Sequence, residues 1–280
     1  MGRGRHYSWW RRWADTIERP LYGSGWAASV AYSLRLQGRL HVDRRTFTFV
    51  ESAGRTPLRV AFVSDLHAGP LTDPRLLDAA VRRIAEAAPD LLLLGGDYVS
   101  LDHGDVSQLA SLLAGLKPSL GIFGVLGNHD LWQDDVAISK ALTEAGVRLL
   151  VNEEHRLPEP HAHIVLYGMD EPGTGSPKSP STQLGDGDIR LVLMHSPLGL
   201  RHLDATPFHV AFCGHTHGGQ IAMPSGTPIV VPRGSGDRRH ARGGLFSVNG
   251  GQLLVSRGLG MSDLPLRIFA PSEVHLCTVA

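Results

Sequence analysis

The stretch Leu58-Arg-Val-Ala-Phe-Val-Ser64, followed at once by Asp65-Leu-His67, decides the fold of this chain. Its first part is a short apolar run of strand length, which predicts a buried β-strand. Its second part places a carboxylate and an imidazole directly after that strand. Because ligand sites in open α/β sheets form beyond the carboxyl ends of the strands, these two side chains are candidates for a functional site.

The same order of strand and polar side chains recurs further along, and helical segments separate the strands. Apolar runs at 91–94 and 121–126 end in Asp97 and in Asn128-His-Asp130. Apolar residues show helical spacing at 73–88, 106–114 and 134–145, and another strand is predicted at 147–151. Strands that alternate with helices of this length predict an α/β layer with parallel strands buried on both faces.

The second half of the chain is richer in strand-like runs. Strands are predicted at 163–167, 189–194, 208–213, 228–231, 245–248, 252–256 and 274–279. Two long polar loops interrupt them, and the second, at 232–244, carries Arg233, Arg238, Arg239 and Arg242. This basic loop is interpreted as a solvated segment, with contact to a second phosphate of a substrate as the alternative.

Two of the later strands also end in candidate ligands, His195 and His215-Thr-His217. Any one such cluster has an ordinary explanation, because Asp and His after a strand often form turns or cap helices. Asp130, for example, is interpreted as the N-cap of the following helix. Five clusters at the same edge of a sheet, however, favour a metal site over turn chemistry.

The candidate ligands combine carboxylates, imidazoles and one amide: Asp65, His67, Asp97, Asn128, His195, His215 and His217. The set contains no thiolate, so a structural zinc site is not expected, and it is too rich in imidazole for calcium or a simple magnesium site. Mixed nitrogen and oxygen ligands suit Mn²⁺, Fe²⁺ or Zn²⁺ without choosing between them. The set is too large for one ion, whereas two ions that share a carboxylate fit it and are typical of phosphoester hydrolysis.

These motifs, in this order, resemble the calcineurin-like metallophosphoesterase superfamily over about residues 58–280. The motifs are Asp65-x-His67, Gly96-Asp97, Gly127-Asn-His-Asp130, His195 and Gly214-His-Thr-His217. A bacterial subfamily of membrane-associated phosphodiesterases and UDP-2,3-diacylglucosamine hydrolases is resembled most, through Gly214-His-Thr-His-Gly-Gly-Gln220, Ser256-Arg-Gly-Leu-Gly260 and Pro265-Leu-Arg267. The resemblance implies an α/β fold, a four-layer α/β/β/α sandwich of two mixed sheets.

The resemblance also implies two divalent metal ions and a role for each ligand. One ion would be held by Asp65, His67, Asp97 and His217, and the other by Asp97, Asn128, His195 and His215. Asp97 would bridge, with its two oxygens reaching the two cations. A water bound to such ions has a pKa near ~7, so the expected nucleophile is a metal-bound hydroxide.

His129 is implied to be the catalytic residue that lies beside the leaving group, as a general acid or as a donor to the phosphate. Many members of the superfamily carry an Asp where this chain has Ser100. A missing carboxylate would lower the pKa of His129 unless Asp102 or another acid takes its place.

The expected function is therefore that of a metal-dependent hydrolase acting on phosphodiester or pyrophosphate bonds, with lipid-linked substrates included. The alternatives are a nuclease or phosphomonoesterase of the same superfamily, and a non-catalytic metal-binding module on the same fold. All of the ligands are present, which argues against the module. Residues 51–280 contain 18 basic and 24 acidic side chains, a net charge of −6, which argues against binding of long nucleic acids.

Residues 1–55 differ from the remainder and are predicted to be a basic, Trp-rich leader, with the enzyme domain at 56–280. Residues 1–50 have nine arginines and no lysine against three acidic side chains, a net charge of +6. Trp9, Trp13 and Ile17 recur every four positions, which predicts an amphipathic helix that Pro20 ends. Such a helix is expected to contact an anionic membrane. Packing on its own domain or on a second subunit are the alternatives, and the oligomeric state is left open.

The leader shows no signal for crossing or export. Its longest mainly apolar stretch, Trp26–Leu34, is far shorter than the ~20 residues that span a bilayer. Arg11-Arg12 is not followed by the apolar run that a signal peptide requires. The protein is therefore expected in the cytoplasm, with peripheral contact at the inner face of the membrane as the role of the leader.

Overall fold

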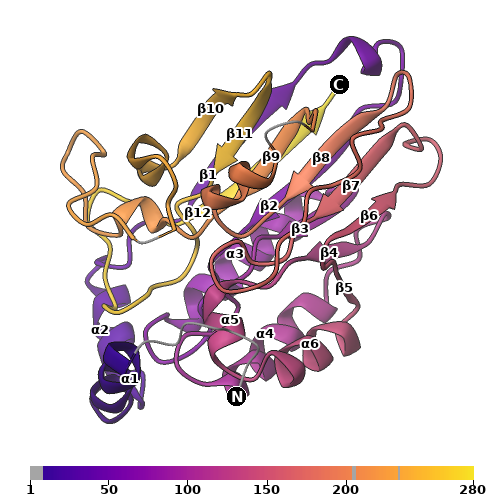
Figure 1. The fold of residues 1–280 in the computed structure, drawn as a ribbon. Coiled ribbons are helices and arrows are strands. Elements are labelled where there is room, and N and C mark those ends of the chain that lie inside the picture. Colours follow the sequence, from indigo (N-terminus) through magenta and orange to yellow (C-terminus); the bar gives the residue numbers. More distant parts are fainter. Residues whose placement is uncertain (1–8, 204–205, 233) are drawn as a thin grey trace.

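Two mixed β-sheets lie face to face in the computed structural model of the protein (Figure 1). The structure describes residues 9–203, 206–232 and 234–280, with side chains from residue 16 onward. The first sheet contains, in spatial order, β1 (His41–Phe47), β12 (Glu273–Val279), β2 (Leu58–Val63), β3 (Leu91–Leu94), β4 (Ile122–Gly124) and β5 (Val147–Leu149). The second contains β10 (Gly244–Val248), β11 (Gly251–Val255), β9 (Val210–Cys213), β8 (Ile189–Leu193), β7 (Ile164–Gly168) and β6 (Glu153–Arg156). Strands β2 to β5 are parallel, as are β7, β8, β9 and β11.

The centre of the first sheet is buried on both faces, which explains why β2 and β3 are almost continuous apolar runs. Helices α3 (Pro74–Ala87), α4 (Val106–Ala114) and α6 (Asp135–Glu144) cover its outer face. In β2, Ala61 and Val63 pack in the core beneath these helices, whereas Val60 and Phe62 pack in the core between the two sheets. Side chains that alternate between two cores thus fix the position of the strand end, and with it the position of Asp65.

The outer face of the second sheet is covered by a thinner layer. A further apolar cluster, which includes Met169, Met194 and Phe208, lies on this face with Leu200 packed against it. Leu200 belongs to the 3₁₀ helix η3 (Pro197–His202), so this outermost layer is built from 3₁₀ helix and loop. The fold is an α/β sandwich of two mixed sheets, as the resemblance implied.

The N-terminal segment contains α1 (Trp9–Tyr22) and α2 (Trp26–Ser33) before β1. The prediction that Pro20 ends the first helix is wrong. Proline removes one hydrogen bond, but Pro20 lies two residues before the end of α1, where Gly23 N–H still reaches Arg19 O at 2.8 Å. The side chains of residues 9–13, on which the amphipathic pattern was based, lie outside the described part of the chain.

The segment between α2 and β2 contacts the rest of the fold closely. Buried Gln37 donates to the carbonyls of Leu71 and Pro265, and its side-chain oxygen accepts the N–H of Asp73. Strand β1 falls within the range assigned to the leader and pairs in parallel with β12 along its whole length. The boundary at residue 55 stays a prediction, but residues 37–47 are built into the first sheet and its loops.

Three strand assignments differ from the sequence-based prediction. No strand forms at the described residues 228–231, where Pro228 makes an isolated bridge with Ala222. The prolines at 228 and 232 cannot donate to a ladder. Strands β1 and β6 were not predicted, because edge strands exposed to solvent carry many charged residues. None of the described helices has the length and apolar character needed to cross a membrane.

Candidate metal centre

The predicted ligands come together where strand ends from both sheets meet. Asp65 and Asp97 follow β2 and β3, and Asn128 begins the short helix α5 (Asn128–Trp132) after β4. From the second sheet, His195 follows β8 and His215 follows β9. Three overlapping groups of ligand atoms result: Asp65, His67 and His217; His67, Asp97 and His129; and Asp97, His195 and His215.

The first group is centred on two facing imidazoles. The Nε2 atoms of His67 and His217 are 3.0 Å apart, and Asp65 Oδ1 lies 3.5 Å from His217 Nε2. Burial lowers the pKa of His67 to about 3 and, together with the nearby His67, holds the pKa of His217 well below its usual value. Both rings are therefore neutral. Two nitrogens that each lie about 2.1 Å from one ion are about 3 Å apart, so this pair fits a metal ion.

The third group is centred on His195, and Asn128 lies beside it. His195 Nε2 lies 3.0 Å from Asn128 Oδ1 and 3.2 Å from His215 Nδ1. Its Nδ1 donates to Gly95 O at 2.8 Å, which directs Nε2 toward the other ligand atoms. A main-chain carbonyl that orients the second nitrogen of a histidine is a common feature of metal sites.

Asp97 lies between His67 of the first group and His195 of the third, and presents one oxygen to both histidines. Its Oδ2 is 3.6 Å from His67 Nε2 and 3.4 Å from His195 Nε2. Its Oδ1 accepts the N–H of His129 at 2.8 Å. Burial alone would raise the pKa of Asp97, but the facing His195 and His129 outweigh burial and hold it well below the usual value. The carboxylate is thus charged, and the geometry differs from the expectation of one oxygen for each cation.

The backbone around these ligands is strained. Asp65, Asp97, His215 and His217 adopt positive φ angles of 54°, 54°, 71° and 50°, in the left-handed region that costs non-glycine residues about 1–2 kcal/mol each. Glycines make room beside them, since a Cβ at Gly214 would overlap Asp65 Oδ2.. Backbone strain of this kind persists where the surrounding contacts hold the residue in its conformation, and it is common at functional sites.

The interpretation of Asp130 as the N-cap of the following helix is wrong. Asp134 caps α6, with Ala137 N–H donating to its Oδ1. Asp130 instead lies inside α5 and is fully buried. Its carboxylate accepts the N–H groups of Asp97, Tyr98 and Gly127 at 2.9, 2.8 and 2.9 Å. It therefore clamps the turn that carries Asp97 to the turn that carries Asn128.

Asp130→Ala is expected to lower the free energy of unfolding by about 3 kcal/mol or more, because three buried N–H groups lose their acceptor at ~1–3 kcal/mol each. Urea unfolding of the metal-free protein measures this change. Asp134→Ala is the matched control, with an expected loss of about 1 kcal/mol for a helix cap. Equal losses for the two variants would contradict the clamp.

His129 lies beside the first group but is held differently from the ligands. Its ring centroid is 4.8 Å from those of His67 and Trp132. Its Nδ1 lies 3.5 Å from the carbonyl oxygen of Ser100, whose hydroxyl turns away and donates to His67 O. The carbonyl of the residue that replaces the usual Asp therefore faces the ring.

Asp102 does not take the place of the missing acid. Its Oδ2 lies 3.4 Å from Arg19 Nη1, and its Oδ1 accepts the N–H of Gly104 at 2.8 Å. Both Asp102 and Arg19 are half exposed. The carboxylate is thus engaged with α1 and with its own turn.

Arg267 lies in the motif Pro265-Leu-Arg267, and its role could not be predicted from the sequence. This buried guanidinium donates to the carbonyls of His217, Arg257, Gly260 and Ala270, and its Nη2 lies 3.2 Å from His217 Nδ1. It thus fixes the loop behind one of the ligands. A lone arginine in an apolar context was the only available signal in the sequence.

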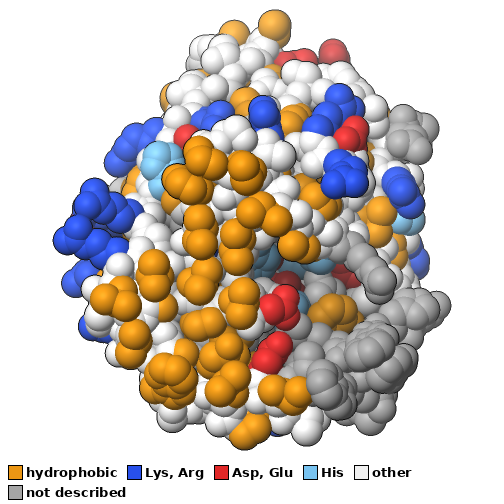
Figure 2. Space-filling model, turned by 90° about the vertical axis from the view of Figure 1, so that its left-hand side faces the viewer, with side chains coloured by type: hydrophobic (Ala, Val, Ile, Leu, Met, Phe, Trp, Pro, Cys, Tyr) orange, Lys and Arg blue, Asp and Glu red, His pale blue; other side chains and the backbone are white. Residues whose placement is uncertain are grey.

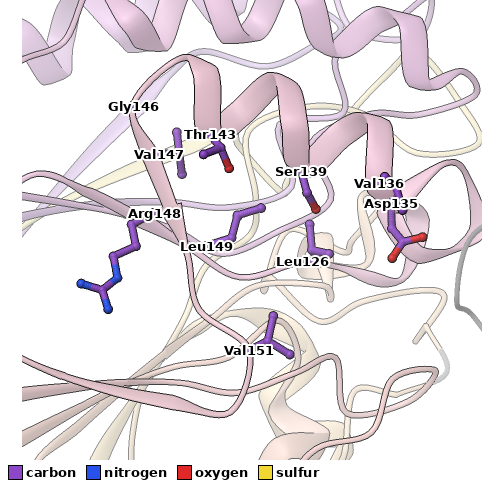
Figure 3. A pocket seen from close by; sticks show the side chains of 10 residues that line it. All are labelled: Leu126, Asp135, Val136, Ser139, Thr143, Gly146, Val147, Arg148, Leu149 and Val151. Carbon is purple, nitrogen blue, oxygen red and sulfur yellow. The ribbon is translucent and has the colours of Figure 1, made fainter.

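The cluster opens into a cavity of about 410 Å³. Polar ligands form its floor, and Ile221, Val230 and Leu264 contribute apolar walls. A larger groove of about 650 Å³ lies between α6 and β5, where Val136, Leu149 and Val151 line it (Figure 3). Its lining shares no residue with the ligand groups, so chemistry is assigned to the smaller cavity.

A two-sheet α/β sandwich that gathers Asp, His and Asn side chains at its strand ends, in groups that could hold metal ions, is typical of metal-dependent phosphoesterases. The chain belongs to the calcineurin-like phosphoesterases, whose family model matches residues 58–219. It is a hydrolase acting on phosphoester bonds, and its family uses divalent metal ions.

Characterised relatives are similar over most of their length. Phosphodiesterase YaeI of Escherichia coli is 31% identical over 225 residues, which cover 79% of this chain and 81% of the relative. UDP-2,3-diacylglucosamine pyrophosphatase LpxG of Chlamydia muridarum is 27% identical over 271 residues, covering 78% and 82%. A solved dimetal phosphatase from Danio rerio aligns with a TM-score of 0.48 at 11% identity, covering 72% of this chain and 88% of that one.

Proposed function

We propose that the protein is a dinuclear-metal phosphodiesterase or pyrophosphatase. Asp65, His67 and His217 would hold one ion, Asn128, His195 and His215 the other, and Asp97 would bridge them through Oδ2. The observation that carries this proposal is the position of Asp97 Oδ2 between His67 Nε2 and His195 Nε2, at 3.6 and 3.4 Å. The mixed nitrogen and oxygen donors suit Mn²⁺, Fe²⁺ or Zn²⁺.

When bound, two such ions would supply Lewis acidity to the phosphoryl oxygens and make water nucleophilic at neutral pH. The residues of the chain add orientation and proton transfer. His129 would protonate the leaving-group oxygen from its Nε2, because Nδ1 faces the Ser100 carbonyl and holds the ring in place. Proton donation of this kind typically contributes 10²–10⁴-fold to the rate.

The substrate proposed for this site is a phosphodiester or a pyrophosphate, with a lipid-linked molecule as the favoured case. Two observations support it: relatives named for phosphodiesterase and diacylglucosamine pyrophosphatase activity, and apolar walls beside the ligands in the same cavity. We propose residues 56–280 as the enzymatic unit, with the N-terminal segment as an accessory to it.

The test is a substrate screen of the protein reconstituted with Mn²⁺, Fe²⁺ or Zn²⁺. Mono- and diesters and UDP-2,3-diacylglucosamine are offered, and mass spectrometry identifies which bond was cleaved. Cleavage of diesters or pyrophosphates with no turnover in chelator is expected. Activity on monoesters alone, or none with any metal, would overturn the proposal.

Metal binding is expected to release about one proton per chain near pH 7. Without metal, burial alone would lower the pKa of His195, but the charge of Asp97 outweighs it and raises the pKa to about 10. His195 is then protonated at neutral pH and must lose its proton to bind an ion. Affinity should therefore rise with pH, and should fall more steeply below pH 6, where Asp65, with a pKa raised to about 6 by burial, also takes up a proton.

Calorimetric titration with metal in buffers of different ionisation heats measures the released protons. His195→Gln should remove most of the release. Metal binding by the wild-type protein without proton release would contradict the assignment of His195 as a ligand.

A further inference from the structure

Exposed apolar side chains lie beside the cavity that contains the candidate metal ligands. They come from the end of α2 and the turn after it, from the loop 221–232, and from the loop 263–270. We call the following six side chains the apolar rim: Leu34, Leu36, Met223, Ile229, Val230 and Phe269. Figure 2 shows hydrophobic side chains gathered beside and below a hollow in which histidine and acidic side chains are visible.

Main-chain hydrogen bonds join these three segments into one surface. Arg267 N–H donates to Leu36 O at 2.6 Å, and Ala222 N–H donates to Ile268 O at 2.8 Å. The loop 221–232 closes on itself through Ile229 N–H and Ile221 O at 3.0 Å. Contiguous apolar patches of this kind are uncommon on soluble monomers unless they contact a partner or a membrane.

Trp26 extends this surface onto α2. Its side chain is 55% exposed, and its indole Nε1–H already donates to Leu21 O at 2.9 Å. The exposed part of the ring is therefore apolar. Tryptophan is the side chain most typical of the interface between a bilayer and water.

Arginines lie at the outer border of the rim, whereas one exposed acidic side chain, Asp263, lines the cavity itself. The twelve residues 221–232 contain no charged side chain. Exposed Arg35 and Arg39 flank the leucines of the rim, and the 3₁₀ helix η5 (Arg238–Arg242), which carries three exposed arginines, packs against η4 (His217–Gly219). An apolar centre with an arginine border matches the headgroup region of an anionic bilayer.

The position of the cavity favours a lipid surface over a protein partner as the occupant of the apolar rim. Val230 of the rim lines the same cavity as His215 and His217. A protein that covered the rim would close this cavity, whereas a lipid surface would deliver its molecules into it. We propose that the apolar rim docks the protein on an anionic lipid bilayer, so that the metal site receives phosphoester headgroups directly from that surface. This inference rests on the proposed function.

The test is co-sedimentation of the metal-loaded full chain with phosphatidylcholine vesicles, with and without phosphatidylglycerol. The triple variant Met223→Ser/Ile229→Ser/Phe269→Ser is expected to bind at least tenfold more weakly. Its matched control replaces three exposed valines elsewhere, Val50→Ser/Val136→Ser/Val151→Ser, and should bind as the wild type does. Thermal unfolding and metal content verify that both variants are folded.

The arginine border is tested separately. Arg35→Gln/Arg39→Gln should weaken binding to the anionic vesicles roughly fivefold per arginine, with little effect on neutral ones. Arg82→Gln/Arg83→Gln, on exposed α3, is the control and should leave binding unchanged.

Three outcomes would overturn the proposal: no sedimentation of the wild type at low salt, equal binding by the rim variant, or a dimer in solution that the rim variant dissociates. The last would assign the face to a second copy of the chain. Hydrolysis of a soluble diester is measured in parallel without vesicles. Vesicle binding without hydrolysis would refute the proposed function alone, and hydrolysis without vesicle binding would refute the docking alone.

Discussion

Asp97→Asn is expected to reduce bound metal from two ions per chain to one or none, and to lower the rate of phosphoester hydrolysis by about 10³-fold or more. Asp97 Oδ2 faces His67 Nε2 and His195 Nε2, so the charge of the carboxylate would offset the repulsion between two cations. Asparagine keeps an oxygen for the N–H of His129 but loses that charge. Metal assistance is worth several kcal/mol of transition-state stabilisation, which corresponds to a loss of this size.

Elemental analysis of the purified variant gives the metal stoichiometry, and steady-state kinetics on a diester give the rate. Asp102→Asn is the matched control, because Asp102 is half exposed and contacts Arg19. It should keep both ions and nearly full activity. Two metal ions per chain in the Asp97 variant would refute the bridging role.

His129→Ala should keep both metal ions but lower kcat by about 10²-fold or more on esters with poor leaving groups. The loss should shrink for esters of acidic phenols, because such leaving groups depart without a proton. The structure supports a role apart from the ligands, since the N–H of His129 is bonded to Asp97 and its ring Nδ1 faces the carbonyl of Ser100.

A series of aryl phosphodiesters with leaving groups of rising pKa measures this effect. His103→Ala, at a half-exposed histidine, is the control and should follow the wild-type series. A loss for His129→Ala that is the same across the series would rule out a general acid and leave phosphate positioning as the role of His129. Loss of metal would instead place His129 among the ligands, as its proximity to His67 and Asp97 allows.

The main-chain carbonyl of Ser100 changes what is expected of His129. A carboxylate in that position would stabilise the imidazolium and raise its pKa, whereas a neutral carbonyl stabilises it less. The structure turns the Ser100 hydroxyl toward His67 O, so the side chain does not compensate.

The sequence alone indicated the strands of the first sheet other than β1, and the residue types at their ends. In β2 and β3 every residue packs in one of two cores except Arg59, so the apolar runs reveal the strands without knowledge of their neighbours. The ligand types after each strand indicated metal chemistry, and the structure brings these residues together. Their assignment as ligands remains a proposal.

Only the tertiary structure decided how the residues around the site are used. Asp130 binds backbone groups about 30 residues away, and Arg267 binds carbonyls beside His217, 50 residues away. Backbone donors and acceptors are the same in every residue, so such pairings leave no mark on side-chain patterns. The Ser100 carbonyl that faces the His129 ring is likewise a main-chain group.

The apolar rim and the edge strand β1 could not be predicted from the sequence for a related reason. The rim joins segments near residues 35, 225 and 267, and each contributes only a few apolar residues that look unremarkable in their own stretch of sequence. Strand β1 is charged and half exposed, and its pairing with β12 links the two ends of the chain. Local pattern therefore determined which elements form and which chemistry their ends carry. Contacts between distant segments, which depend on shape and on main-chain hydrogen bonds, determined what those elements build together.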